Sequence, residues 1–202
     1  MITVIDYKVG NLHSVMNALR FIGADAIVSS DIADIRRADK LILPGVGAYP
    51  DSVAALKASG LFDQIIAECH DGKPLLGICL GMQLLFDESL EFGRNEGLGL
   101  IPGRVVPIDA HGLKIPHMGW NCLTNHQDDK LISGVNNGDY VYFVHSFRAD
   151  TNDENIISST DYGEKIPAIV KSNDLNVWGA QFHPEKSQDA GLKIFKNFAD
   201  IK

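Results

Sequence analysis

Residues 74–81 read PLLGICLG, and a cysteine stands in them between two glycines, directly after an apolar run. Residues 75–78 are short, continuous and apolar, as expected of a strand covered on both faces of a sheet, and residues 80–86 favour a helix. The Gly-x-Ser-x-Gly elbow has the same plan: it presents a nucleophile on a sharp strand-to-helix turn, with oxygen in place of sulfur. The stretch therefore predicts an α/β sheet and a reactive thiol at Cys79. A buried structural cysteine beside a glycine-rich turn is the alternative.

The first ninety or so residues repeat this alternation of strand and helix. Short apolar runs predict strands, and helically spaced apolar residues followed by glycine predict helices. The strands are expected at residues 3–5, 26–28 and 41–43, and the helices at residues 11–22, 51–59 and 61–70. Such alternation is typical of an α/β protein with an open, mostly parallel central sheet flanked by helices.

The pattern changes after about residue 98. The second half is β-rich with Gly, Asn and Asp turns, so antiparallel strands are expected to extend the sheet or to form a second small one. These strands are expected at residues 104–109, 140–148, 156–160, 168–171 and 177–182, before a closing helix at residues 190–201. Since no repeat or linker divides the chain, residues 1–202 are expected to form a single domain.

Composition narrows the class of protein. The chain has 202 residues, of which 45% are hydrophobic and 22% charged, as is ordinary for a soluble globular protein. Its formal net charge of −8 argues against nucleic acid or an anionic membrane as the main partner. The opening MITVIDYKVGNLHS lacks the features of a secretory signal, and no apolar stretch is as long as a membrane span. A cytoplasmic enzyme is expected.

Three cysteines without a CxxC pair favour free thiols over a disulfide framework or a zinc site. Cys69 and Cys122 lack flanking elbow glycines and are expected to be small buried hydrophobic residues. The acidic pair Asp128 and Asp129 is expected to be solvated surface.

A nucleophilic cysteine needs a base, and the base needs an orienting group. His183 follows an apolar strand pattern in VWGAQFHPEKS, residues 177–187, and Glu185 stands two residues later. Residues two apart on an extended chain project to the same side, so the carboxylate is expected to fix the imidazole while its other nitrogen faces Cys79. For a lone His-Pro-Glu, an exposed histidine at a strand end is the commoner alternative.

A third segment is expected at the same edge of the sheet. Residues 41–47, LILPGVG, predict a strand that runs into a proline–glycine turn. Its backbone could offer one N–H to a tetrahedral oxyanion, and the amide of Leu80 at the helix start could offer another. The carboxyl ends of parallel strands meet at one edge of an open sheet, where sites are built. A simple strand-ending turn is the alternative.

Four motifs in this order resemble the triad-type, class I glutamine amidotransferases, which have a flavodoxin-like fold. They are LPGVGAYPDS at 43–52, GICLGMQLLFDESLEFG at 77–93, FVHSFRA at 143–149 and GAQFHPEKS at 179–187. The opening IDYKVGNLHSV and the central PHMGWN make the chain similar, over essentially its whole length, to the glutaminase subunits of imidazole glycerol phosphate synthases.

The resemblance implies a role for particular residues. Cys79 would be the nucleophile, His183 the acid and base, and Glu185 its orienting group. The oxyanion donors would be the N–H groups of Leu80 and of Val46 or Gly47. The implied substrate-binding groups are Gln83, Glu91 and the backbone of His145, Ser146 and Phe147. The family often has tyrosine or threonine in this last motif, so Phe147 departs from the pattern.

The implied reaction is hydrolysis of glutamine to glutamate and ammonia through a glutamyl thioester, with no metal and no organic cofactor. The ammonia would pass to a (β/α)8-barrel cyclase subunit, the partner in a heterodimer. The cyclase would form imidazole glycerol phosphate and an aminoimidazole carboxamide ribonucleotide (AICAR) in histidine biosynthesis. Asn11, Tyr142 and Lys186 would face this partner, whereas Trp120 could lie in the core or at the interface.

Three other functions remain open on sequence alone. The chain could be the glutaminase subunit of another amidotransferase, serving a pyridoxal phosphate or surface-sugar pathway. It could also be a hydrolase of γ-glutamyl peptides. A non-catalytic binding module is the third, and the joint presence of Cys79, His183, Glu185 and Gln83 speaks against it.

Overall fold

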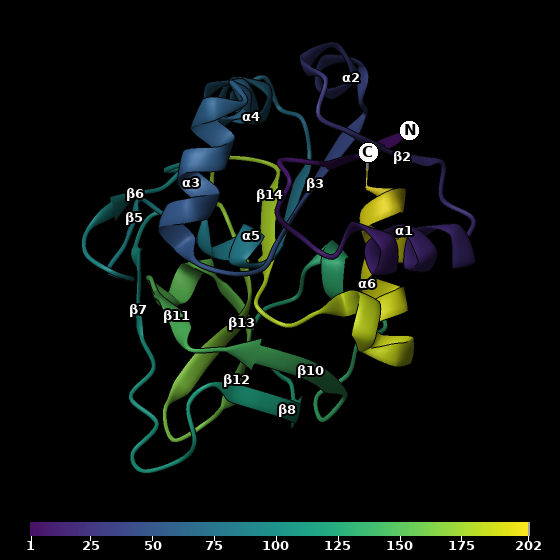
Figure 1. The fold of residues 1–202 in the computed structure, drawn as a ribbon. Coiled ribbons are helices and arrows are strands. Elements are labelled where there is room, and N and C mark those ends of the chain that lie inside the picture. The colour runs from purple at the N-terminus through teal and green to yellow at the C-terminus, as the bar shows by residue number, and fades with distance from the viewer. Residues whose placement is uncertain (202) are drawn as a thin grey trace.

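A computed structural model describes residues 1–201 and has an eight-stranded sheet at its centre (Figure 1). The sheet has the order β2-β1-β3-β4-β14-β13-β12-β9. Its first five strands pair in parallel and the last three are antiparallel, which confirms the predicted fold class. In chain order the strands are β1 (Ile2–Ile5), β2 (Ala26–Ser29), β3 (Lys40–Gly45), β4 (Leu75–Cys79), β9 (Thr124–Asn125), β12 (Ile156–Asp161), β13 (Lys165–Lys171) and β14 (Val177–Ala180).

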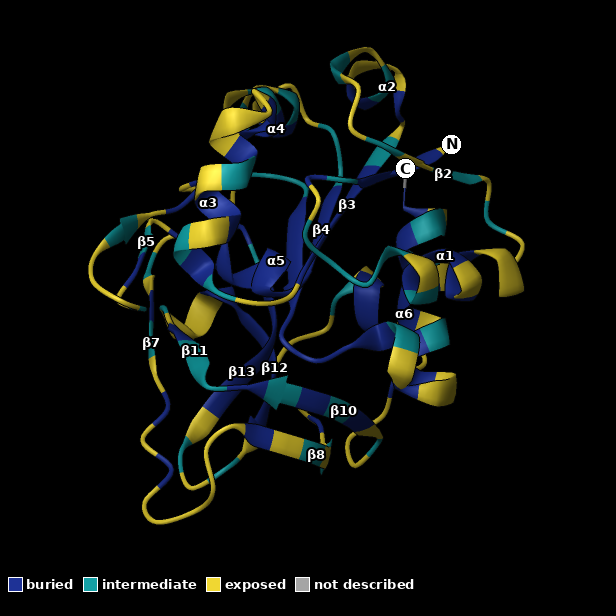
Figure 2. Cartoon of the chain, viewed as in Figure 1, coloured by how far each residue is buried: buried dark blue, intermediate teal, exposed yellow. Residues whose placement is uncertain are grey.

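Helices cover both faces of this sheet, as the continuous apolar strands require. On β3, Ile42 packs into the core beneath α1 (Leu12–Phe21) and α6 (Gln188–Asp200), while Leu41 and Leu43 pack beneath the helices of the opposite face. Those helices are α2 (Ile32–Arg37), α3 (Tyr49–Ala58) and α4 (Leu61–His70). Figure 2 shows the central strands buried and the outer sides of the helices exposed. No helix within residues 1–201 has the length and apolar character needed to cross a membrane.

Two smaller sheets stand beside the central one. One pairs β8 (His117–Cys122) with β10 (Tyr140–His145) in antiparallel fashion. The other has the order β11-β7-β5-β6. Its strands are β5 (Glu88–Ser89), β6 (Asn95–Glu96), β7 (Arg104–Pro107) and β11 (Phe147–Asp150), and the three 3-10 turns of the chain's described part are η1 (Lys130–Ile132), η2 (Asp153–Asn155) and η3 (Pro184–Lys186).

Several predicted elements differ from those of the structure. Residues 140–148 are not one strand: β10 and β11 belong to different sheets and the chain changes sheet at Ser146. Residues 177–182 were expected to pair antiparallel, but β14 also lies parallel to β4, with Gly179 opposite Gly77. The six-residue helix α2 was not predicted, and the helix after Cys79, α5 (Leu80–Gln83), is shorter than expected.

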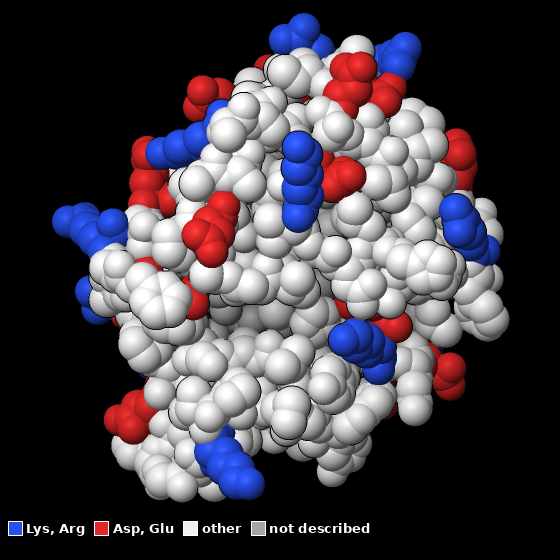
Figure 3. Space-filling model, in the orientation of Figure 1, with Lys and Arg blue, Asp and Glu red and all other residues white. Residues whose placement is uncertain are grey.

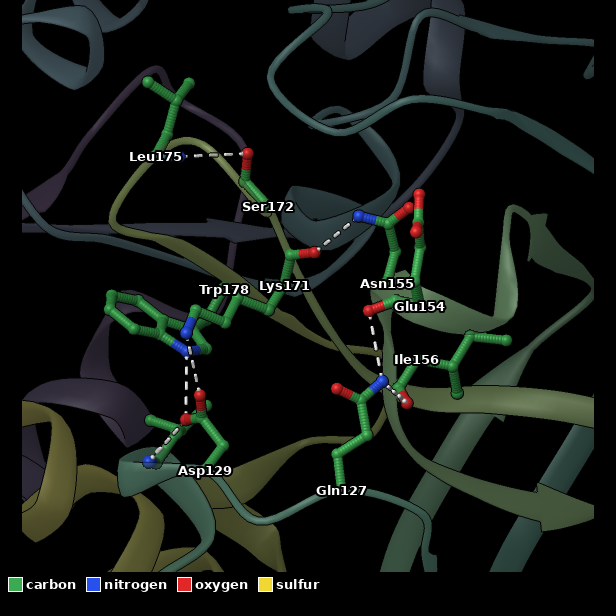
Figure 4. A network of polar contacts seen from close by, with 10 residues as sticks. Gln127, Asp129, Glu154, Asn155, Ile156, Lys171, Ser172, Leu175 and Trp178 are labelled. Atoms are coloured by element: carbon green, nitrogen blue, oxygen red, sulfur yellow. Dashed lines mark hydrogen bonds and ion pairs between the residues drawn. The ribbon is translucent and has the colours of Figure 1, made fainter.

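The predicted solvated surface at residues 128–129 is wrong for Asp129, whose side chain is only 7% exposed. Its carboxylate accepts hydrogen bonds from Trp178 Nε1 at 3.1 Å and from the N–H of Leu131 at 2.7 Å, and pairs with Lys171 Nζ at 3.1 Å (Figure 4). A buried carboxylate needs such partners. Asp129 therefore fixes the loop before η1 to β13 and β14.

The predicted burial is confirmed for Cys69 and wrong for Cys122, which is exposed. Side chains alternate along a strand, and in β8 the set that includes Met118, Trp120 and Cys122 points away from the core. Only one face of this two-stranded sheet is covered.

Candidate active site

Cys79 ends β4 at a sharp bend before α5. Its backbone adopts φ 55° and ψ −111°, a conformation that non-glycine residues rarely take and that clusters at functional sites. Gly45 of β3 lies opposite Cys79 in the parallel ladder. The sheet on one side and the helix on the other thus hold the thiol at the carboxyl edge of the central strands, as the elbow pattern predicts.

The two glycines around Cys79 are required by close packing. A Cβ built on Gly81 would lie 1.8 Å from the carbonyl oxygen of Leu43, and a Cβ on Gly77 would lie 2.6 Å from that of Gly81. Neither neighbour is a flexible side chain. The start of α5 therefore packs directly on the backbone of β3 and β4, and this explains why glycine flanks the thiol on both sides.

His183 and Glu185 form a buried pair beside this bend. The imidazole Nδ1 and the carboxylate Oε1 are 2.8 Å apart, and the side chains are 3% and 1% exposed. The predicted pairing is present, but its expected backbone is wrong. His183 lies three residues beyond the end of β14, and Glu185 lies in the 3-10 turn η3. The turn, rather than an extended strand, brings the carboxylate to the ring.

The electrostatic environment favours the charged imidazole. Burial lowers the pKa of His183, but the interaction with the Cys79 sulfur and the hydrogen bond to Glu185 outweigh it and raise that pKa to about 10. Glu185 occupies Nδ1, so Nε2 is the nitrogen on the Cys79 side. It makes no hydrogen bond within the described part of the chain. A protonated His183 beside the sulfur stabilises a thiolate.

A cavity of about 300 Å³ opens in front of Cys79 and His183. This is the size of a small-molecule site. It is also lined by the predicted oxyanion and substrate-binding residues Val46, Gly47, Leu80, Gln83, Glu91, His145, Ser146 and Phe147, and by Pro116 and Val144, which sequence reasoning did not select. Of the predicted catalytic residues only Glu185 lies outside the lining, behind His183. A larger open hollow at residues 125–137 shares no lining residue with this cavity.

Gln83 is held by two hydrogen bonds at the cavity wall. Its side-chain Nε2 donates to the carbonyl of Phe147 at 3.0 Å and to Oε1 of Gln181 at 3.1 Å. Gln181 is fully buried, and its own Nε2 lies 4.0 Å from the Cys79 sulfur. Sequence reasoning missed Gln181, although it stands in the same motif as His183, because only the fold turns this strand-end side chain toward the elbow.

Glu91 and His145 reach the cavity from opposite halves of the chain. Burial raises the pKa of Glu91, while a 3.0 Å hydrogen bond from the backbone N–H at position 49 partly offsets this effect. Burial lowers the pKa of His145 to about 3, so this ring is neutral. His145 bonds to the carbonyl of Phe147 at 2.8 Å and to His117 at 3.0 Å. These contacts fix the backbone at residues 145–147.

The residues predicted to face a partner lie beside His183, although none of them lines the cavity. Lys186 Nζ is 5.7 Å from the ring centre of Tyr142, which meets Trp120 edge-on at 5.9 Å. Asn11 caps α1, accepting the N–H of Ser14 at 3.4 Å, and lines a small void together with Glu185. The structure thus brings Tyr142 and Lys186 together and places Asn11 beside His183 and Glu185.

An apolar surface extends from these residues over the open side of β8 and β10. Met118, Trp120 and Tyr140 are 65%, 43% and 60% exposed there. Figure 3 shows a hollow near the middle of the molecule, with mostly uncharged side chains below it and charged side chains above it and on either side. Within residues 1–201, no three His, Cys, Asp or Glu side chains gather in a way that could hold a metal ion.

Comparison with known sequences identifies relatives over the full length. A family model for class-I glutamine amidotransferases matches residues 3–201. The imidazole glycerol phosphate synthase subunit HisH of Caldanaerobacter subterraneus subsp. tengcongensis is 49% identical over 202 residues, which cover 100% of this chain and 98% of that protein. The same subunit of Methanothermobacter thermautotrophicus is 48% identical over 201 residues, with 100% and 98% coverage.

Solved structures share the fold at much lower identity. A crystal structure of a glutamine amidotransferase superposes with a TM-score of 0.77 at 18% identity and covers all of both chains. PurLQS from Thermotoga maritima superposes with a TM-score of 0.74 at 23% identity, covering 98% of this chain and 96% of that one. At these identities the likeness concerns the arrangement of strands and helices.

Proposed function

The chain belongs to the class-I glutamine amidotransferases, and from this premise we propose that it is the glutaminase subunit of an imidazole glycerol phosphate synthase. One observation carries the proposal: a single cavity is lined by Cys79 on its elbow, by His183 backed by Glu185, and by Gln83 and Glu91. The full-length relatives at 48–49% identity bear the name of that subunit.

Glutamine would bind with its side-chain amide at the elbow. The Glu91 carboxylate offers a charged acceptor for the α-ammonium group of the substrate, and Gln83 is fixed at the wall by Phe147 and Gln181. The backbone of residues 145–147 supplies further polar groups, because the chain leaves one sheet and enters another there. Preorganised groups of this kind reduce the entropic cost of orienting a substrate.

The first half of the reaction forms a thioester. The Cys79 thiolate attacks the γ-amide carbon. The developing oxyanion accepts hydrogen bonds from the backbone N–H groups of Leu80 and of Val46 or Gly47. Protonated His183 donates its proton to the departing nitrogen, which leaves as ammonia. The raised pKa of His183 supports this order, since the imidazole carries the needed proton before attack.

The second half regenerates the enzyme. His183, now neutral, removes a proton from water, and the hydroxide attacks the thioester carbonyl. The tetrahedral intermediate expels the Cys79 thiolate and releases glutamate. Glu185 stabilises the imidazolium that forms in this step and keeps its Nε2 toward the sulfur. Side chains and backbone N–H groups of this chain supply every step, so we propose a reaction without metal or organic cofactor.

Ammonia would be used by a second subunit. We propose that a (β/α)8-barrel cyclase docks on the apolar surface of β8 and β10, near Asn11, Tyr142 and Lys186, and converts the ammonia into imidazole glycerol phosphate and AICAR. The exposed apolar side chains of Met118, Trp120 and Tyr140 on this surface support a protein partner there. A cytoplasmic heterodimer follows from this proposal. The Caldanaerobacter and Methanothermobacter relatives bear the name of this synthase rather than that of a pyridoxal phosphate or surface-sugar pathway.

Glutamate formation from glutamine tests the proposal. It is measured for the isolated chain and for the chain with the cyclase of a relative and its nucleotide ligand. We expect low turnover alone, a large increase in the complex, and none above background for Cys79→Ala with an unchanged circular dichroism spectrum. Mass spectrometry after rapid quench should locate a glutamyl adduct on Cys79. Turnover that survives Cys79→Ala would move the nucleophile elsewhere, and no stimulation by the cyclase would reject the partner.

A further inference from the structure

Beyond these residues, Pro44 occupies an unusual place in the central sheet. The parallel ladder between β3 and β1 ends at Ile42, whereas the ladder between β3 and β4 continues to Gly45. Pro44 is therefore flanked by a strand on one side only, yet it is buried and immediately precedes the proposed oxyanion turn, residues 45–47. A buried carbonyl at such a position needs a donor from elsewhere.

Tyr7, two residues beyond the end of β1, supplies that donor. Its hydroxyl donates to the carbonyl of Pro44 at 2.8 Å, and the side chain is 2% exposed. The hydroxyl also packs against the turn itself, since a Cβ built on Gly45 would lie 2.7 Å from it and 2.7 Å from the N–H nitrogen of Gly81. One phenol thus contacts the oxyanion turn where the turn meets the start of α5.

The hydroxyl is kept as a donor by its surroundings. Burial raises the pKa of Tyr7 far above its usual value, the neighbouring Ser52 hydroxyl lowers it in part, and the negative charge of Cys79 raises it further. The Ser52 hydroxyl has no hydrogen-bond partner among residues 1–201, so the Pro44 carbonyl accepts the Tyr7 proton.

Tyr7 also belongs to the loop that ends at Asn11, one of the residues proposed to lie near the partner. Residues 6–11 connect β1 to α1 and include positive φ angles at Lys8 (66°) and Gly10 (137°). A Cβ built on Gly10 would lie 3.5 Å from the Pro44 side chain, and Asn11, Pro44 and Val46 line the same small void. The loop and the oxyanion turn are therefore packed as one unit.

We infer that Tyr7 is a positioning residue: its hydrogen bond to Pro44 holds the oxyanion turn in register with the loop 6–11 and transmits docking at that loop to the turn. The inference rests on the proposed function, because it concerns how the same site is activated. Tyr7 does not contact the substrate cavity, and it acts through the backbone of residues 44–47.

Tyr7→Phe tests the inference, with Tyr162→Phe as a matched control. Tyr162 also donates its hydroxyl to a backbone carbonyl, that of Lys114 at 2.7 Å, and it does not line the cavity. Glutaminase kcat and KM are measured for both variants and wild type in complex with the cyclase. For Tyr7→Phe we expect kcat to fall about tenfold, the effect of one lost buried hydrogen bond, with KM within about twofold. Tyr162→Phe should match wild type.

Alkylation by iodoacetamide distinguishes positioning of the turn from damage to the triad. The reaction needs the Cys79 thiolate but develops no oxyanion at the turn, so its rate should be equal in Tyr7→Phe and wild type. Peptide mapping in a Cys122→Ser background removes the exposed thiol from the measurement. A tenfold slower alkylation in Tyr7→Phe would overturn the inference, because the thiolate itself would then be disturbed.

The response to the cyclase separates a failure of this inference from a failure of the proposed function. If the cyclase stimulates Tyr7→Phe as strongly as wild type, the inference fails and the proposed function stands. If the cyclase does not stimulate wild type, both fail. If Tyr7→Phe does not fold, hydrogen exchange of wild type replaces it: docking should slow exchange at residues 45–47 together with residues 6–11. Slowing at residues 6–11 alone would overturn the inference.

Discussion

The two sides of the proposed oxyanion site are built differently. At the elbow, Gly81 packs so closely on β3 that a Cβ would lie 1.8 Å from a backbone oxygen. At the opposite turn, a Cβ on Gly47 would meet nothing within 4 Å, and Val46 is 39% exposed. One N–H donor is thus fixed by the core of the sheet, while the other stands at the surface on a turn tethered by Tyr7. The fold leaves only the second donor free to respond to a partner.

The largest expected effect is on stability and compares a glycine from each side. Gly81→Ala forces backbone atoms of β3 and α5 apart, so we expect a loss of at least about 4 kcal/mol of unfolding free energy or failure to fold. Gly47→Ala introduces no clash but retains the strained φ of 95°, and we expect a loss of about 1–2 kcal/mol. Urea unfolding monitored by circular dichroism measures both. Equal losses would show that the two sides are equally rigid.

The elbow could be predicted from sequence because its requirements are local. A strand, two glycines and a helix start are all encoded within residues 74–83, and the structure places Cys79 where that pattern predicts. His183 and Glu185 were paired correctly, although the expected extended backbone was wrong. Their separation of two residues lets a 3-10 turn close the same contact.

The features that sequence did not predict all depend on distant packing. The position of β14 between β4 and β13 depends on the order of strands across the whole sheet, where the parallel part meets the antiparallel part. Gln181 and Tyr7 acquire partners 98 and 37 residues away in the chain, and no local pattern marks either side chain as part of the site. Asp129 looked like solvated surface because its partner Trp178 lies 49 residues further on.

The next effect is the pH dependence of the unfolding free energy that the raised pKa of His183 causes. The folded-state pKa of His183, about 10, lies above its usual value of 6.5. The native state therefore binds this proton more tightly than the unfolded state, which gives stability that is fully present below about pH 6.5 and is lost as pH rises through about 10. One pKa unit corresponds to about 1.4 kcal/mol, so the loss across this window should be at least that large.

Nuclear magnetic resonance titration of the His183 ring measures this pKa directly. Cys79→Ala removes the group that raises the pKa most, so its midpoint should move down by at least one unit. Gly47→Ala changes only the turn and should leave the midpoint unchanged. A shift in Gly47→Ala as large as that in Cys79→Ala would mean that the turn is electrostatically coupled to the elbow. The two sides of the site would then not be independent.

A third effect is expected on partner binding, at the open surface of β8. Trp120 is half-exposed on the open side of β8, and an aromatic anchor in a protein interface is worth about 2 kcal/mol. Trp120→Ala should therefore weaken cyclase binding about 30-fold, measured by isothermal titration calorimetry. Phe21→Ala provides the control, because Phe21 is 78% exposed at the far end of α1 from Asn11.

At saturating cyclase, kcat of Trp120→Ala should return to the wild-type value, since docking aligns the turn once it occurs and the elbow needs no partner. A kcat that stays low at saturation would place Trp120 in the alignment of the turn itself, and equal weakening by Phe21→Ala would move the docking surface away from β8 and β10.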